Sequence, residues 1–224
     1  MTQTWNDLLF AHWRVDPAQL ATKVPASLPL DLFEGQAFVG VVPFHMTNVG
    51  PRGLPAIPGM SAFPELNVRT YVRVGGKPGV FFFSLDATNP LAVRVARTFF
   101  RLPYYRATMT VVSQGDDVRY CSERVGSNAA LVGTYRPVGP VYQAREGTLD
   151  YFLTERYCLY TVNRRGRPYI AEIHHPPWPL QAAEVNFTLN TMTDVFGLPL
   201  PSGDAPLLHF AKRQDTIAWR LTRA

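Results

Sequence analysis

The segment E-L-N-V-R-T-Y-V-R-V, Glu65–Val74, has the most regular pattern in the chain. Leucine, valine and threonine alternate in it with polar or aromatic residues, as in a strand whose successive side chains point to opposite faces. One of these faces would carry Glu65, Asn67 and Arg69. The following Gly75–Gly79 predicts a turn, and the largely apolar segment 80–86 predicts a central strand that returns beside the first.

Short strands separated by glycine and proline turns extend this pattern over the rest of the chain. Further strands are expected at Leu8–Val15, Gln36–Thr47, Tyr104–Ser113, Val118–Arg124, Cys158–Asn163, Arg167–His174 and Ala183–Asn190, with a last hairpin of Leu207–Lys212 and Thr216–Thr222. Helices are expected at Pro17–Lys23, 89–100 and Thr148–Tyr157, and a loop at Gly50–Pro64. We therefore expect one domain over residues 1–224. Its class would be α+β, mostly antiparallel β, with about ten or more strands and a few short helices in a barrel or sandwich.

The composition is that of a globular chain. Apolar residues make up 46% of the 224 residues and charged residues only 17%, which excludes disorder because disorder requires low hydrophobicity and high charge. No apolar run approaches the roughly 18 residues of a membrane span, and the first ten residues lack the basic and apolar regions of a signal peptide. Cys121 and Cys158 are too few for a disulfide framework or a four-ligand zinc site. We therefore expect a cytoplasmic protein without a membrane span.

The motifs of several function classes are missing. The net charge is +5, but the arginines are scattered and no nucleic-acid-binding motif accompanies them, so no nucleic-acid partner is expected. The sequence contains no glycine-rich phosphate loop, nucleophile elbow or metal-ligand spacing, so no cofactor and no metal are expected. His174 and His175 are neighbours on an expected strand and would point to opposite faces. Their role is left open.

Two stretches carry a family resemblance. The segment W-R-V-D-P-A-Q-L-A-T-K-V-P-A-S-L-P-L-D, Trp13–Asp31, resembles the N-terminal strand and helix of acetoacetate decarboxylase. Residues Glu65–Tyr105 resemble the core of that enzyme. A glutamate begins a strand there, an apolar strand ends in L-D, and a helix and a proline follow. The sequences E-L-N-V-R-T-Y-V, F-S-L-D-A, A-R-T-F-F-R-L-P-Y and P-P-W-P-L are similar to the uncharacterised YqjF-like family within this superfamily. The resemblance implies an acetoacetate decarboxylase-like fold.

The same resemblance implies that the decarboxylase reaction is absent. That reaction needs a lysine amine that forms a Schiff base with the substrate ketone, and the corresponding position here is Tyr104, followed by Tyr105. A phenol cannot form an imine. The chain has three lysines, Lys23, Lys77 and Lys212, and we expect each of them to be solvated.

The candidate ligand-binding residues are Glu65, Asn67, Arg69 and Tyr104. Glu65 and Tyr104 match active-site positions of the family, and strand alternation places Asn67 and Arg69 on the Glu65 side. If Glu65 is buried it must either be protonated or meet a donor, and Tyr104 and Arg69 are the donors we expect. The alternatives are an ion pair between Glu65 and Arg69, a solvent-exposed face, and a Tyr104 that only packs in the core.

Three functions remain open. The first is binding of a small oxo or carboxylic acid in a central cavity, without a Schiff base. The second is an enzyme with a lysine-free acid/base mechanism on such an acid, and the third is an interaction protein whose cavity is filled by side chains. Shared fold does not decide among them. A homo-oligomer is compatible with each.

Overall fold

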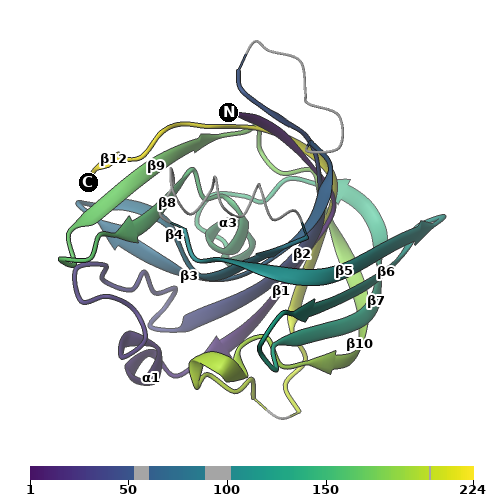
Figure 1. Cartoon of the computed structure of the whole chain (residues 1–224), viewed down its shortest axis with the longest axis horizontal. Helices are drawn as coiled ribbons and strands as arrows, with labels where there is room; N and C mark the ends of the chain where they lie inside the picture. Colours follow the sequence, from purple (N-terminus) through teal and green to yellow (C-terminus); the bar gives the residue numbers. More distant parts are fainter. Residues whose placement is uncertain (53–60, 89–101, 202) are drawn as a thin grey trace.

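The computed structural model describes residues 1–52, 61–88, 102–201 and 203–224. Within these ranges one sheet contains all twelve strands (Figure 1). The strands are β1 (Thr2–Val15), β2 (Ala37–Gly50), β3 (Phe63–Val74), β4 (Lys77–Ala87), β5 (Tyr104–Gln114), β6 (Asp117–Arg124), β7 (Ala130–Tyr142), β8 (Cys158–Val162), β9 (Pro168–His174), β10 (Leu180–Asn190), β11 (Leu207–Ala218) and β12 (Thr222–Arg223). The helices are α1 (Pro17–Ala21), α3 (Leu149–Thr154) and the 3-10 turn η1 (Asp194–Phe196).

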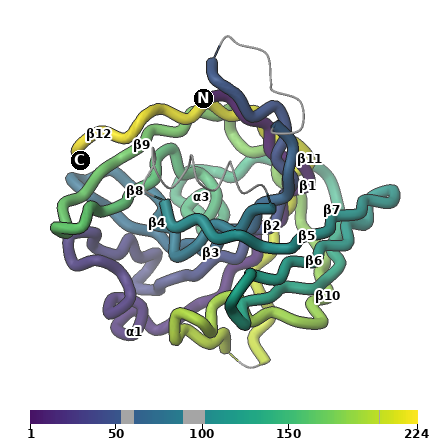
Figure 2. Tube along the Cα trace, viewed as in Figure 1, coloured from purple at the N-terminus to yellow at the C-terminus, as the bar shows by residue number. Residues whose placement is uncertain are grey.

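The sheet closes on itself in two places, and both closures depend on a strand that changes partner. Strand β4 pairs with β8 through Val80 and Phe81, and then with β5 through residues 85–87; both pairings are parallel. Strand β11 pairs with β10 and, near its end, with β9. The result is two rings that share β4, β3, β2, β1 and β11. The smaller ring adds β8 and β9 and surrounds α3 (Figures 1 and 2).

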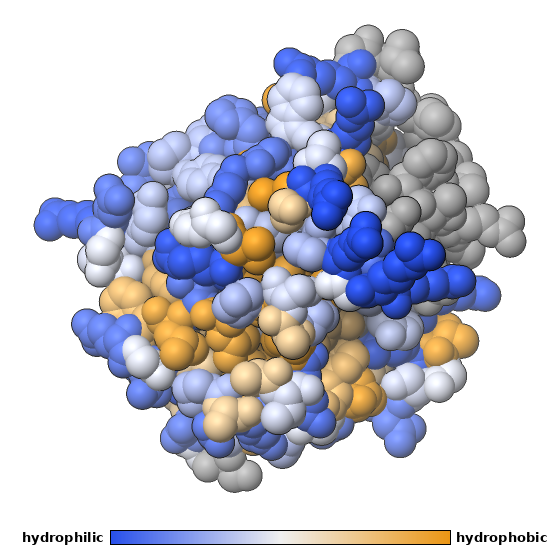
Figure 3. Space-filling view, turned by 90° about the vertical axis from the view of Figure 1, so that its left-hand side faces the viewer, coloured by the Kyte–Doolittle hydropathy of each residue, from blue (hydrophilic) through white to orange (hydrophobic). Residues whose placement is uncertain are grey.

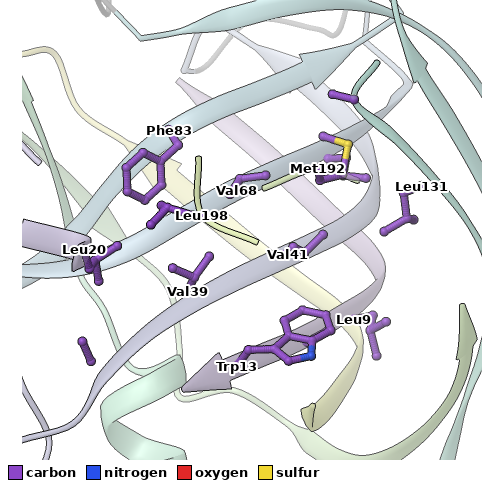
Figure 4. Packing of buried hydrophobic residues seen from close by; sticks show 14 of the residues in the cluster. Leu9, Trp13, Leu20, Val39, Val41, Val68, Phe83, Leu131, Met192 and Leu198 are labelled. Atoms are coloured by element: carbon purple, nitrogen blue, oxygen red, sulfur yellow. The ribbon is translucent and has the colours of Figure 1, made fainter. Parts of the chain in front are cut away.

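Strand β3 buries both of its faces over most of its length, because each face looks into one of the two rings. On β3, Leu66 and Val68 belong to the hydrophobic core of the larger ring, which Figure 4 shows around Val41, Val68 and Leu131. The opposite face of β3 looks into the smaller ring. The alternation expected for this strand is therefore confirmed, and its polar face is enclosed rather than exposed to solvent.

Most expected elements are confirmed. Helix α1 begins after Asp16, whose carboxylate accepts a hydrogen bond from the Ala18 backbone N–H at 2.9 Å, as the N-cap position requires. The expected fold class, α+β and mostly antiparallel, is also confirmed. The expected helix at 89–100 and residues 53–60 of the expected loop lie outside the described residues.

Two expectations differ from the structure. The last hairpin is wrong, because Leu207–Ala218 is one continuous strand. Its polar run K-R-Q-D has the composition of a turn, but it pairs with β1, and the Lys212 ammonium lies 2.6 Å from the carboxylate of Asp7 on that strand.

Strand β7 was not expected from the sequence because it contains prolines. Pro137 is tolerated there since β7 pairs with β6 only as far as Tyr135, so no ladder hydrogen bond to β6 is lost.

A buried ion pair spans the closure of the larger ring. The guanidinium of Arg124, on β6, donates to both carboxylate oxygens of Asp86, on β4, at 2.8–3.1 Å. Strand β5 lies between these two strands, and the ring of Tyr105 lies 4.2 Å from Arg124 Cζ. Asp86 and Arg124 are 38 residues apart in sequence. They meet because β5 pairs with both of their strands.

The outer surface mixes residue types. Figure 3, a view of the side at the left of Figure 1, shows apolar residues in the middle of this face with hydrophilic residues around them. None of the described helices has both the length and the apolar composition that crossing a membrane requires.

We predict that Arg124→Met lowers the free energy of unfolding by about 3–5 kcal/mol, because it leaves the Asp86 carboxylate buried without its cation. Arg136→Met is the matched control, since Arg136 forms an exposed pair with Glu184 and such pairs contribute less than about 1 kcal/mol. Urea unfolding at neutral pH measures both losses. The double variant Asp86→Leu/Arg124→Met should recover most of the first loss, and equal losses in the two single variants would contradict the prediction.

Candidate functional site

All four candidate residues line one cavity of about 160 Å³ in the smaller ring. Glu65, Asn67 and Arg69 reach it from the enclosed face of β3, because they are two residues apart along the strand. Tyr104 begins β5, where the parallel pairing with Leu85 holds it beside β4. The structure thus brings together residues that are 39 positions apart in sequence. Binding of a ligand by these residues stays a prediction.

Glu65 and Tyr104 form a hydrogen-bonded pair. Glu65 is 3% exposed, and its Oε2 accepts a hydrogen bond from the Tyr104 hydroxyl at 2.8 Å. Burial raises the pKa of Glu65 to about 8; the Tyr104 hydrogen bond opposes this shift, and the charge of Asp86 adds to it. Burial and the neighbouring Glu65 also raise the pKa of Tyr104 well above its ordinary value. At neutral pH Glu65 is therefore mainly a carboxylic acid with a proton that it can donate.

Arg69 is buried, and its hydrogen bonds in the described part of the chain include none to an acidic side chain. Its Nη2 donates to the carbonyl oxygen of Leu153 on α3 at 3.2 Å, and its Cζ lies 5.0 Å from the ring centre of Phe10. Its Nε and the Oδ1 of Asn67 are both buried with no hydrogen-bond partner within the described residues. The expectation that Arg69 would donate to Glu65 is wrong, because its side chain turns toward α3 instead. Tyr104 is the expected donor that the structure supports.

Helix α3 supplies cavity residues that sequence reasoning missed. Thr154 is the last residue of this helix and Arg156 follows its C-cap; both line the cavity. Arg156 is neutralised, because its Nη1 lies 2.6 Å from Oδ2 of the buried Asp31. The place of Thr154 and Arg156 beside the cavity could not be read from the sequence, since α3 enters the ring only through tertiary packing.

His175 and Trp178 complete one wall. His175 is buried, stacks on Tyr157 with ring centres 4.6 Å apart, and has its Nδ1 2.7 Å from the Pro176 carbonyl oxygen. Burial lowers its pKa. His174 is exposed on the other side of the strand, as the alternation indicates. Trp178 stacks on Trp5 with ring centres 5.7 Å apart.

The rest of the cavity wall is mostly apolar. Its members include Leu8, Val42, Phe44, Met46, Phe63 and Leu85. In such surroundings water screens charges poorly, so a polar contact is stronger and an unpaired polar group costs more. The few polar atoms of the cavity are therefore the ones that would orient a ligand.

All three lysines of the chain lie outside this cavity lining. Lys77 forms an exposed ion pair with Glu172 at 2.6 Å, and Lys212 forms one with Asp7 at the same distance. Lys23 is exposed near α1. Within the described ranges, moreover, no three histidine, cysteine, aspartate or glutamate side chains are arranged to hold a metal ion. Of the two cysteines, Cys121 lies in β6 and Cys158 in β8, as expected.

Comparison with known proteins identifies close and distant relatives. The family model DUF2071, described as an uncharacterized conserved protein, matches residues 2–215. The uncharacterized protein YqjF of Bacillus subtilis (strain 168) is 52% identical over 224 residues, which is 100% of this chain and 92% of that protein. The resemblance noted in the sequence is therefore confirmed.

Solved structures share the fold at low identity. The enduracididine biosynthesis enzyme MppR complexed with pyruvate superposes with a TM-score of 0.64 at 10% identity, covering 98% of this chain and 89% of that one. Acetoacetate decarboxylase from Legionella pneumophila gives a TM-score of 0.62 at 14% identity, covering 100% and 87%. At such identities the likeness shows the fold alone. The chain therefore belongs to the DUF2071 family of uncharacterized conserved proteins, and it has an acetoacetate decarboxylase-like fold.

Proposed function

We propose that this protein binds a small oxo or carboxylic acid in the cavity of the smaller ring, with the ligand carboxylate at Arg69 and without a Schiff base. The observation that carries the proposal is the buried guanidinium of Arg69, which has no carboxylate within ion-pair distance in the described residues. Residues 53–60, 89–101 and 202 include no aspartate or glutamate in their sequence. An anionic ligand would supply the missing charge.

The energetics favour an anion at this place. An arginine stays protonated in proteins, and a buried charge without a partner costs several kcal/mol. The planar guanidinium also matches a carboxylate geometrically, since it can donate two parallel hydrogen bonds to the two oxygens. The Nε of Arg69, which has no hydrogen-bond partner among the described residues, is one of the donors that such an arrangement uses.

The size and polarity of the cavity limit the ligand. A cavity of about 150 Å³ accommodates benzene, so the cavity here suits a molecule of roughly six to eight non-hydrogen atoms. The apolar wall suits a short carbon chain. Glu65, as a carboxylic acid, can donate a hydrogen bond to a ligand oxygen. MppR, which shares the fold, has been solved with pyruvate, and pyruvate has these properties. The open volume weighs against an interaction protein with a filled cavity.

A lysine-free enzyme is the second candidate, and the state of Glu65 favours it. A carboxyl group with a pKa of about 8 can both give and take a proton near neutral pH. Hydrogen–deuterium exchange at the methyl group of pyruvate, followed by NMR in heavy water, distinguishes the two functions. Exchange that depends on Glu65 indicates catalysis, whereas binding without exchange indicates a binding protein.

We predict that pyruvate raises the melting temperature of the protein and that Arg69→Met abolishes the effect. At a pyruvate concentration of ten times Kd the stabilisation is about 1.4 kcal/mol, or roughly 3–5 °C for a chain of this size. Each variant is compared with its own ligand-free baseline by differential scanning fluorimetry. Arg136→Met, on the surface, should keep the full shift. An undiminished shift in Arg69→Met would refute the assigned carboxylate site.

We also predict that borohydride reduction in the presence of acetoacetate traps no adduct, since no lysine lines the cavity. Intact-mass spectrometry should show the unmodified chain, while an authentic acetoacetate decarboxylase treated in parallel should gain mass. A mass increase that maps to Lys23, Lys77 or Lys212 would show that the chain can form an imine after all.

The pKa of Glu65 predicts a pH dependence of stability. Between about pH 4.5 and pH 8 the folded state holds a proton at Glu65 that the unfolded state has released, so stability falls as pH rises through this range. The loss approaches on the order of 4 kcal/mol, at about 1.4 kcal/mol per pKa unit. Glu65→Gln keeps an acceptor for Tyr104 and should remove this slope, which urea unfolding from pH 5 to 9 measures. Glu184→Gln, at an exposed site, should retain the fall of stability with pH. Parallel stability profiles for the wild type and Glu65→Gln would contradict the raised pKa of Glu65.

A further inference from the structure

Strand β5 leaves one edge of the sheet open. It pairs with β6 along Ala107–Gln114, but with β4 only through residues 104–106. From residue 107 to residue 114 its other edge has no neighbouring strand in the part of the chain that the structure describes. Strands β5 and β6 are part of the larger ring, and Figures 1 and 2 show the turn end of their hairpin projecting from it.

The pairing with β6 decides which backbone groups face this open edge. The hairpin has a two-residue turn, Gly115 and Asp116, so Gln114 and Asp117 form a hydrogen-bonded pair. At the other end of the strand, the Val125 N–H donates to the carbonyl oxygen of Arg106 at 2.9 Å, so this even-numbered residue also bonds toward the β6 side. Even-numbered residues of β5 therefore bond to β6. The N–H and C=O groups of the odd-numbered residues, Met109, Val111 and Ser113, point outward.

This edge lacks the usual protection against association. The sequence A-T-M-T-V-V-S-Q of residues 107–114 contains no charge and no proline, whereas natural open edges are commonly shortened, charged or interrupted by proline. Val112 is 52% exposed on it. The strand at the opposite end of the sheet, β12, is only two residues long and includes Arg223, so it is protected in the usual way.

We propose that β5 pairs with β5 of a second copy of this chain, antiparallel and across a two-fold axis at Val111. The outward-facing backbone groups belong to odd-numbered residues, so an odd-numbered residue must lie opposite an odd-numbered residue of the partner. The two residue numbers of each pair therefore add up to an even number. With Val111 opposite the partner's Val111, Met109 lies opposite the partner's Ser113. On the exposed face, Thr110 lies beside the partner's Val112.

Charge complementarity selects this register and this partner. The same pairing places Arg106 opposite the partner's Asp116, and the two-fold axis repeats the contact. Both residues are exposed, and neither has an ion pair within the described residues. An antiparallel strand is complementary to itself in a two-fold dimer, and β5 supplies backbone donors, an uncharged centre and opposite charges at its two ends. The inference is independent of the proposed ligand.

Sedimentation equilibrium of the full chain at 1–100 μM tests the proposal. The wild type should have twice the chain mass of 25.1 kDa. Val112→Arg, which brings positive charges together at the two-fold axis and stays exposed in a monomer, should weaken the dimer at least tenfold. Val141→Arg is the matched control on β7, 60% exposed, and should leave the dimer intact. A monomeric wild type, or a dimer that survives Val112→Arg, overturns the proposal.

A charge exchange tests the register separately. Arg106→Asp and Asp116→Arg should each weaken the dimer, because each places like charges opposite one another at both contacts. The double variant Arg106→Asp/Asp116→Arg should restore the wild-type dissociation constant to within a few-fold. Circular dichroism establishes that all variants are folded. Failure of the double variant to recover the dimer overturns the proposed register.

Discussion

The partner change of strand β4 is the constraint on which the rest of the structure depends. Its first half pairs with β8 and its second half with β5, so one continuous sheet closes into two rings instead of one. The smaller ring encloses α3 and the cavity; the larger ring is filled by apolar side chains. The Asp86–Arg124 pair lies at the second half of this strand and connects it to β6 across β5.

The shared strands turn a local sequence pattern into a buried polar site. In an ordinary antiparallel sheet with one solvated face, the polar face of β3 would meet water. Here it faces an enclosed cavity, where burial keeps Glu65 protonated and leaves Arg69 charged without an acidic partner. The chain thus has an acetoacetate decarboxylase-like fold, and all three of its lysines lie outside the cavity lining. The fold by itself does not determine the reaction.

Sequence reasoning succeeded where structure is local and failed where it is not. The alternation of β3, the cap at Asp16 and the β5–β6 hairpin follow from short-range rules. The polar run in β11 was misread because only its pairing with β1 makes it a strand. Arg156 and His175 were not assigned to the site, since α3 and the segment after β9 reach the cavity only when the smaller ring closes.

The sequence by itself determined the family, the fold class and the side of β3 that carries Glu65, Asn67 and Arg69. These properties depend on residue identity and on the two-residue period of a strand. Only the tertiary structure decided that this side is enclosed, that Tyr104 donates to Glu65, and that Arg69 turns to α3 and away from Glu65. Burial and pairing of these groups depend on which distant strands close the ring, and no local pattern encodes that closure.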